Sequence, residues 1–152
     1  MRITFLLPFV LAVLSVTAHA DDIAVTPPVT HEVGGSFDDI AFAVENAIVD
    51  AGLVIDGRTR VAEMLADADG DPGGAGDPYT HADVYSFCPA AVSRRVMRAD
   101  PLNIRHCPYA IFLFETPEAP GRITVGRRGY DASMQPVADL LDAIIADAMT
   151  RN

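Results

Sequence analysis

The chain has 152 residues, half of them hydrophobic, and it carries 21 acidic against 11 basic residues, which gives a formal net charge of −10 at pH 7. A surface this acidic repels phosphate backbones, so the composition argues against nucleic-acid binding. The length suits one small domain with a single core.

The first twenty residues have the pattern of a signal peptide. Arg2 forms a short basic region, an apolar run extends from Ile3 to Val16, and small residues flank a predicted cleavage site after Ala20. The run is shorter than the about 20 apolar residues that a membrane span needs. We therefore expect the cleaved protein to be periplasmic or secreted and to have no contact with the membrane.

The expected division of the chain follows from this cleavage. Residues 1–20 are the signal peptide, residues 21–28 a linker, and residues 29–152 the folded domain. No internal repeat divides this domain further.

The N-terminal part of the domain shows one strong helical pattern. Apolar residues recur at helical spacing from Phe37 to Ala51, Ser36 offers an N-cap hydroxyl, and Gly52 can adopt the left-handed conformation that ends a helix. The other elements expected here are a strand, a second strand, a turn and a short helix: Thr30–Val33, Leu53–Asp56, Gly57 and Val61–Ala66.

A glycine- and proline-rich loop follows the short helix. Asp67, Asp69 and Asp71 stand at the first, third and fifth positions of a calcium-loop pattern, but Pro72 and Pro78 occupy the positions that need glycine and glutamate. We expect a solvated acidic loop here, with weak calcium binding as the alternative.

The C-terminal part of the domain contains three expected strands and two expected helices. Tyr109–Glu115 has apolar residues at both its odd and its even positions, which is typical of a central strand covered on both faces. It is expected to form a hairpin with Arg122–Arg127. The remaining elements are a strand, a helix with Pro89 at its first position, and an amphipathic helix with Ser133 as its cap: Ala82–Phe87, Pro89–Ala99 and Val137–Ala148. Because a hairpin occurs among alternating helices, we predict a single α+β domain with a mixed or antiparallel sheet and helices packed on it.

Both cysteines lie at ends of expected strands, Cys88 after one strand and Cys107 just before the next. Two cysteines of an exported protein usually pair, and a strand–helix–strand unit would bring these strand ends together. A disulfide is one interpretation. The alternatives are a reactive redox pair, in which Cys88 at a helix start is the thiolate, a soft-metal site completed by His81 and His106, or two unpaired thiols.

The same segment carries a family pattern. Phe87 to Ile111 has the form FC-x-A-x-x-SR-x-x-M-x-ADP-x-N-I-x-x-CPY-x-I, and RTRVAEML (58–65) and VGRR (125–128) accompany it. This combination resembles the domain-of-unknown-function family 302 (DUF302) from about Val29 to Met149. The resemblance implies a small α+β domain that tends to form homodimers, and it brings no agreed reaction.

Arginines gather on the helix after Cys88. Arg94 and Arg98 are one turn apart, with Arg95 beside them, so they need an anionic partner nearby. This partner is either a carboxylate of the protein itself or a bound small anion, such as a sulfur oxyanion or a carboxylate, because guanidinium groups and helix-start amides bind such groups. The expected site residues are Cys88, Ser93, Arg94, Arg98, His106, Cys107 and Tyr109.

The sequence lacks hydrolase signatures such as G-x-S-x-G and H-E-x-x-H, and it lacks a phosphate-binding glycine loop. We therefore expect an exported binding or accessory protein that recognises a small anion and has no cofactor or metal, rather than an enzyme. One alternative is a thiol-redox or sulfur- and metal-handling protein that uses Cys88 and Cys107. The other is a structural dimeric interaction module.

Overall fold

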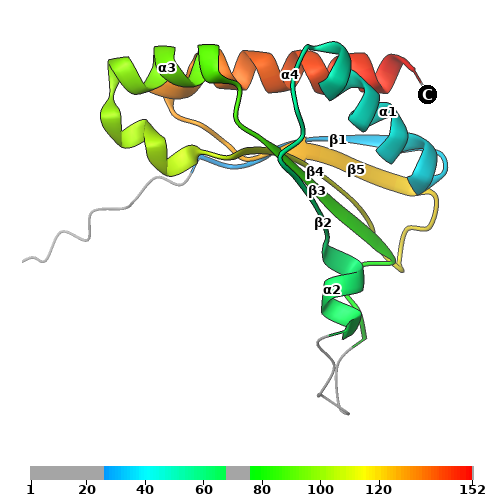
Figure 1. Ribbon diagram of the computed structural model, residues 1–152. Coiled ribbons are helices and arrows are strands. Elements are labelled where there is room, and N and C mark those ends of the chain that lie inside the picture. The colour runs from blue at the N-terminus through cyan, green and yellow to red at the C-terminus, as the bar shows by residue number, and fades with distance from the viewer. Residues whose placement is uncertain (1–25, 68–75, 152) are drawn as a thin grey trace, which may run out of the picture.

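The structure is a computed structural model that describes residues 26–67 and 76–151 (Figure 1). The expected signal peptide, most of the linker, and Asp69 and Asp71 of the calcium-like loop lie outside the described residues. Within the described ranges, no helix combines the length and the apolar character that crossing a membrane requires.

The described chain forms one five-stranded sheet with strand order β1-β5-β4-β3-β2, and every neighbouring pair of strands is antiparallel. The elements in chain order are β1 (Val29–Gly34), α1 (Phe37–Asp50), β2 (Gly57–Arg60), α2 (Val61–Asp67), β3 (His81–Phe87), α3 (Ala90–Ala99), the 3-10 helix η1 (Pro101–His106), β4 (Tyr109–Glu115), β5 (Arg122–Arg127), the 3-10 helix η2 (Ala132–Met134) and α4 (Gln135–Thr150). The predicted α+β class is confirmed.

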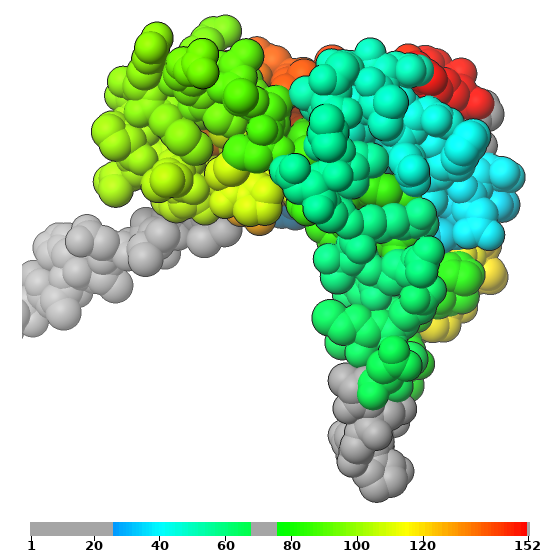
Figure 2. Space-filling model, viewed as in Figure 1, coloured from blue at the N-terminus to red at the C-terminus, as the bar shows by residue number. Residues whose placement is uncertain are grey.

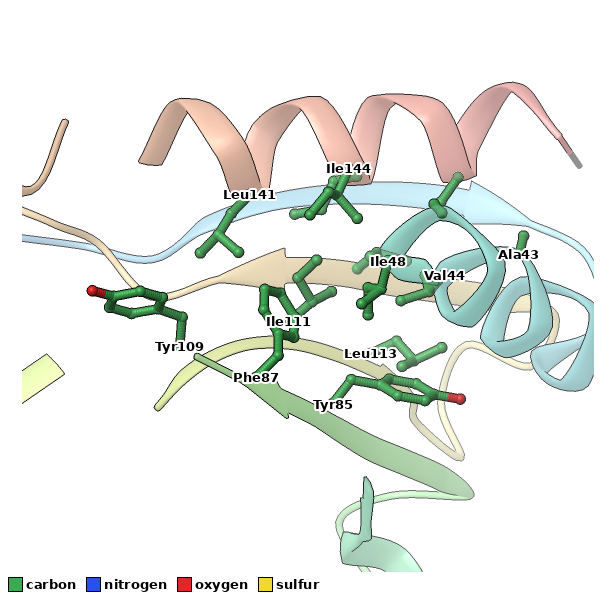
Figure 3. Packing of buried hydrophobic residues seen from close by; sticks show 14 of the residues in the cluster. Ala43, Val44, Ile48, Tyr85, Phe87, Tyr109, Ile111, Leu113, Leu141 and Ile144 are labelled. Atoms are coloured by element: carbon green, nitrogen blue, oxygen red, sulfur yellow. The ribbon is translucent and has the colours of Figure 1, made fainter. Parts of the chain in front are cut away.

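One face of the sheet carries the helices. Figure 1 shows α1, α3 and α4 on the same side, whereas α2 projects beyond the sheet next to β2. The core lies between these two layers, where side chains of β3 and β4 point toward α1 and α4 (Figure 3). The largest contributors are fully buried: Ile48, Tyr85, Phe87, Tyr109, Ile111, Leu113 and Leu141.

The opposite face of the sheet has no helix over it among the described residues, so the prediction that β4 is covered on both faces is wrong (Figure 1). Phe112 and Phe114 lie on this face and are only half-buried. Their rings stack on each other with centroids 6.3 Å apart, and the tip of Phe112 lies over Gly126, where a Cβ atom would come within 2.7 Å of it. The two rings therefore shield one another, which explains how β4 carries large apolar residues on its open face.

The expected strand Leu53–Asp56 is wrong, because β2 begins only at Gly57. Leu53 and Ile55 are half-buried against the core, and this burial produces the apolar alternation without a strand ladder. Gly57, expected as a turn, instead pairs with Ser86 of β3.

Two expected helix starts are also displaced. Pro89 is the N-cap of α3 and not its first helical residue, and Met134 is the N-cap of α4 in place of Ser133. The Ser133 hydroxyl lies in η2 and donates hydrogen bonds to Asp131 and to Asn103, so it is not free to cap α4.

Candidate functional site

The two cysteines form a disulfide at the end of the β3–β4 ladder. Phe87 and Tyr109 are paired across these strands, which places Cys88 and Cys107 side by side with Cα atoms 6.3 Å apart. The predicted strand–helix–strand geometry is confirmed. Because each sulfur is bonded to the other, the alternatives of unpaired thiols and of thiolate metal ligands are wrong.

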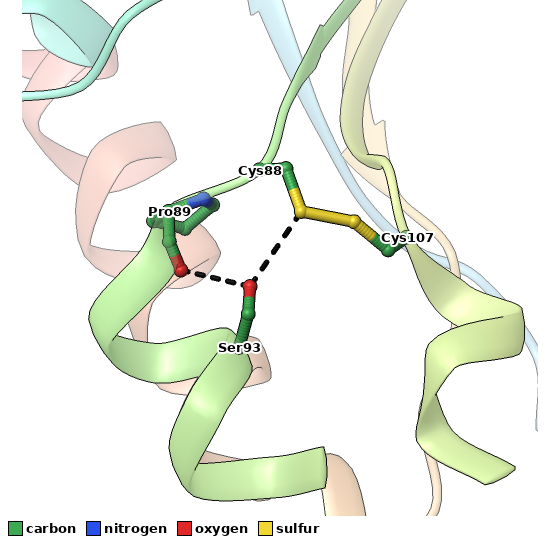
Figure 4. The surroundings of a disulfide bond; sticks show 4 residues. All are labelled: Cys88, Pro89, Ser93 and Cys107. Carbon is green, nitrogen blue, oxygen red and sulfur yellow. Dashed lines mark hydrogen bonds between the residues drawn. A yellow bond between two sulfur atoms is a disulfide. The ribbon is translucent and has the colours of Figure 1, made fainter. Parts of the chain in front are cut away.

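A polar side chain of α3 lies against the disulfide (Figure 4). The buried Ser93 hydroxyl donates a hydrogen bond of 2.8 Å to the carbonyl of Pro89, and its oxygen lies 3.6 Å from the sulfur of Cys88. Cys88 is exposed and Cys107 is half-buried. The disulfide is therefore open to solvent on its Cys88 side.

The arginines of α3 have no carboxylate partner among the described residues. Arg94, Arg95 and Arg98 are exposed and form no ion pair there, so the acids of the described ranges do not neutralise them as expected. The nearby acids are already engaged. Asp100 accepts a hydrogen bond from the backbone of η1, and Asp131 pairs with Arg105 at 3.2 Å.

Three aromatic side chains form a cluster next to Cys107, which we call the aromatic cluster: His106, Tyr109 and Tyr130. Tyr130 lies edge-on to both of the others, with ring centroids 5.4 Å from His106 and 6.4 Å from Tyr109. The His106 Nε2 and both phenol oxygens are buried without a hydrogen-bond partner, and they are the whole set of such side-chain atoms among the described residues. Unpaired buried polar atoms are rare in native proteins, so their concentration at one place calls for a bound partner.

The electrostatics favour the neutral forms of His106 and Tyr130. Burial, followed by the neighbouring Arg105 cation, lowers the pKa of His106, and Arg128 acts in the same direction. Burial raises the pKa of Tyr130. A neutral imidazole and a protonated phenol can both donate hydrogen bonds to an incoming acceptor.

A buried asparagine holds this end of the molecule in place. Asn103 is fully buried, donates a hydrogen bond of 3.0 Å to the carbonyl of Val96 in α3, and accepts one of 3.0 Å from Ser133 in η2. It thereby joins α3, η1 and η2, although β4 and β5 separate the last two in the chain. The family pattern contains Asn103, but nothing in the sequence alone indicated this structural role.

A second feature, which the sequence did not reveal, lies at the other end of β3. A groove of about 520 Å³ is lined by residues of α1, β2, α2 and β3. Arg58 donates hydrogen bonds of 2.9 and 2.6 Å to the buried Asp83 at its floor, and Phe37 stacks on His81 at its wall with centroids 5.0 Å apart. The charged groups at its floor neutralise one another, so this groove offers a weaker basis for a ligand than the aromatic cluster does.

The structure brings only part of the predicted site together. Cys88, Ser93 and Cys107 are in contact, and His106 and Tyr109 join Tyr130 directly beside them. Arg94 and Arg98 project to solvent from α3 and make no contact of their own to this group. Tyr130 was missed because it follows β5 in a segment without any periodic pattern.

The fold is that of small α+β domains in which helices cover one face of an antiparallel sheet. No protein-family model matches the chain, and no curated protein matches it. Among solved structures, it is similar to the crystal structure of the uncharacterized conserved protein DUF302 from Bacillus stearothermophilus, with a TM-score of 0.62, 16% sequence identity, and coverage of 82% of this chain and 96% of that chain. At this identity the likeness shows the fold alone, and it confirms the predicted DUF302-like fold.

Proposed function

We propose that this protein is an exported binding or accessory protein that recognises a small anion at the disulfide end of the sheet. The observation that carries the proposal is the set of three buried polar atoms without partners in the aromatic cluster. A carboxylate or an oxyanion would accept hydrogen bonds from the two phenols and from the imidazole, which the cluster otherwise leaves unmade.

The surroundings favour an anion over a neutral ligand. Arg128 lies close enough to His106 to influence its charge state, and it forms no ion pair with the described residues. Arg94 and Arg98 on the neighbouring helix also form no ion pair within the described ranges. In a chain with a net charge of −10, arginines concentrated at one end attract anions to that end.

The test is a ligand-dependent rise in melting temperature. A true ligand stabilises the folded state by mass action, so phosphate, sulfate and acetate are added at equal ionic strength to the wild type, to Tyr130→Phe and to Arg128→Ala. We expect a rise in the wild type that is reduced in both variants. Tyr79→Phe, which changes a tyrosine outside the aromatic cluster, is the matched control and should behave as the wild type. An equal response of all four proteins would contradict the proposal.

A second candidate function is thiol–disulfide exchange, and the exposure of Cys88 favours it. A dithiol reductant would attack the accessible Cys88 sulfur, form a mixed disulfide with it and release Cys107 as a thiol; its second thiol would then free Cys88 and leave the reductant as a disulfide. Ser93, whose oxygen lies 3.6 Å from that sulfur, is positioned to hydrogen-bond the resulting thiolate. Equilibration in graded glutathione buffers tests this: a bond that stays intact at the most reducing ratio is structural.

The third candidate is a dimeric interaction module, as the resemblance to DUF302 implies. The open sheet face favours it, because Phe112 and Phe114 present half-buried rings that a second sheet would cover. We propose a homodimer through this face. A Phe112→Ser variant should then sediment as a monomer, whereas unchanged sedimentation would rule this face out.

A further inference from the structure

Large apolar side chains are exposed in small groups on the described surface. The six that are more than half exposed are Phe42 (67%), Val49 (55%), Val54 (78%), Met64 (52%), Leu102 (68%) and Ile104 (64%). Scattered apolar residues on a surface need no explanation, but grouped ones mark interaction sites. Two of these groups differ in the charge that surrounds them.

The first group, which we call the basic tip, is Leu102 and Ile104 on η1 with Arg98 and Arg105 on either side in the sequence. The tip is rigid, because Asn103 between its two apolar residues is fully buried and hydrogen-bonded to α3 and η2. Arg105 also donates a hydrogen bond to the carbonyl of Leu102 at 3.2 Å. A rigid apolar pair loses little conformational entropy on binding, which favours it as an interface anchor.

The second group, which we call the acidic stripe, is Phe42 and Val49 on α1. Their spacing of seven residues places them on one face of the helix, two turns apart. Asp38 and Asp39 precede this pair in the first turn, and Glu45, which pairs with Arg58 at 3.6 Å, lies between its members in the sequence. The acidic stripe is thus the reverse of the basic tip in charge, with the same apolar centre.

The two groups cannot meet within one molecule. Figure 1 shows η1 and α3 at one end of the molecule and α1 over the other part of the sheet, and the space-filling view shows them well apart (Figure 2). Neither group therefore covers the other within one molecule. A second copy of the chain carries a surface of opposite charge for each of them.

We propose that the basic tip of one molecule binds the acidic stripe of a second copy. Leu102 and Ile104 pack against Phe42 and Val49, while Arg98, which forms no ion pair with the described residues, faces Asp38 and Asp39 at the start of α1. Arg105 stays paired with Asp131 of its own molecule. A single contact of this kind joins different surfaces and leads to rings or open chains, whereas two reciprocal contacts between the same two molecules close a twofold dimer. It is a separate contact from the sheet-face homodimer and does not depend on anion binding by the aromatic cluster.

The experiment uses the exported protein, purified after cleavage, and two surface variants that each remove one half of the contact. Leu102→Ser with Ile104→Ser removes the tip, and Phe42→Ser with Val49→Ser removes the stripe. Sedimentation velocity across a concentration series measures self-association. The sheet-face homodimer, or the monomer if no such dimer forms, is the baseline species. We expect the dissociation constant for association beyond this species to rise by about tenfold or more in either variant alone, as the loss of an interface anchor predicts.

The decisive arm mixes the two variants, because each retains the half that the other lacks. A tagged tip variant should capture the untagged stripe variant, whereas neither variant should capture an untagged copy of itself beyond the baseline. Arg98→Glu should weaken wild-type association, and Arg122→Glu, an exposed arginine on β5, should leave it unchanged. Association that is equal in all variants, or a mixture that captures no better than the separate variants, would overturn the proposal.

Discussion

Asn103 and Ser133 are joined by a hydrogen bond of 3.0 Å although they lie 30 residues apart in the chain, and the same asparagine amide is bound to the end of α3. The bond connects η1 with η2 directly beneath the disulfide end. The position of the aromatic cluster therefore depends on a side chain that does not itself belong to it.

Replacing Asn103 by alanine removes two hydrogen bonds of a fully buried group, while the carbonyl of Val96 keeps only the one that it accepts from the Asp100 backbone. We expect Asn103→Ala to lower the free energy of unfolding by about 2–3 kcal/mol. Ser133→Ala, which removes one of these bonds, should cost about 1 kcal/mol. Urea denaturation measures both values, and equal losses in the two variants would show that the bond to Val96 contributes nothing.

The disulfide should contribute measurably to stability. Cys88 and Cys107 are 19 residues apart, and closing a loop of this size constrains the unfolded chain by about 3 kcal/mol in the chain-entropy model. The double variant Cys88→Ser with Cys107→Ser should lose about that amount. Adding reductant should destabilise the wild type to a similar degree and leave the double variant unaffected.

Arg127 on β5 and Asp142 on α4 form a bidentate ion pair in which the guanidinium is buried and the carboxylate side chain is 42% exposed. Arg127 is 6% exposed, and its Nε and Nη2 donate hydrogen bonds of 2.6 and 2.7 Å to the two carboxylate oxygens. Asp142→Asn should lower the free energy of unfolding by about 1.5–3 kcal/mol, because a buried guanidinium loses its charged acceptor. Glu32→Gln tests the exposed pair with Arg122 at 3.9 Å, where we expect a loss below about 0.5 kcal/mol.

Gly126 should be irreplaceable in β5 on steric grounds. A Cβ atom there would lie 2.6 Å from the carbonyl oxygen of Val29 and 2.7 Å from the ring of Phe112. We expect Gly126→Ala to destabilise the protein by about 1–3 kcal/mol through overpacking. Gly34→Ala, on the neighbouring strand β1, is the matched control, because its Cβ would meet nothing closer than 3.9 Å. Equal melting temperatures of the two variants would contradict this explanation.

His106 should make stability depend on pH below neutrality. Burial and the cations Arg105 and Arg128 lower its pKa from the ordinary value of 6.5, whereas Asp131 opposes them. The unfolded chain therefore takes up a proton at a higher pH than the folded one does. The contribution of His106 to the free energy of unfolding is therefore fully present above pH 6.5. It is lost as the pH falls from 6.5 toward the lower pKa of the folded state.

Urea denaturation of the wild type and of His106→Gln between pH 8 and pH 5 isolates this contribution. The loss of stability on acidification should be smaller in the variant, because glutamine does not titrate. An identical loss in both proteins would show that groups other than His106 cause it.

How far the sequence predicts this structure depends on how local the responsible pattern is. The helix α1 and the β4–β5 hairpin were predicted closely, because their apolar periodicity and their turn residues lie within a few neighbouring positions. The strand β2 was displaced because the half-buried Leu53 and Ile55 imitate a strand, whereas the polar residues of β2 pair with β3 through backbone bonds that side-chain patterns do not reveal.

The candidate site divides in the same way. The cysteine pair and the neighbouring His106 and Tyr109 were predicted, because they flank strand ends that the pairing of β3 and β4 brings together. Tyr130 was not predicted, since it reaches the site only through the path that the chain takes after β5. Arg94, Arg95 and Arg98 form no ion pair within the described residues because of where the acids lie in three dimensions, and charge counts along the chain do not contain that information.

The disulfide also determines what a protease can do to this protein. The segment between Cys88 and Cys107 contains all of α3 and η1, which lie at one end of the molecule. A cut anywhere in this segment leaves the two fragments covalently joined through the cysteines. Such a nicked protein would keep the mobility of the intact chain on a denaturing gel without reductant and would separate into two pieces only after reduction.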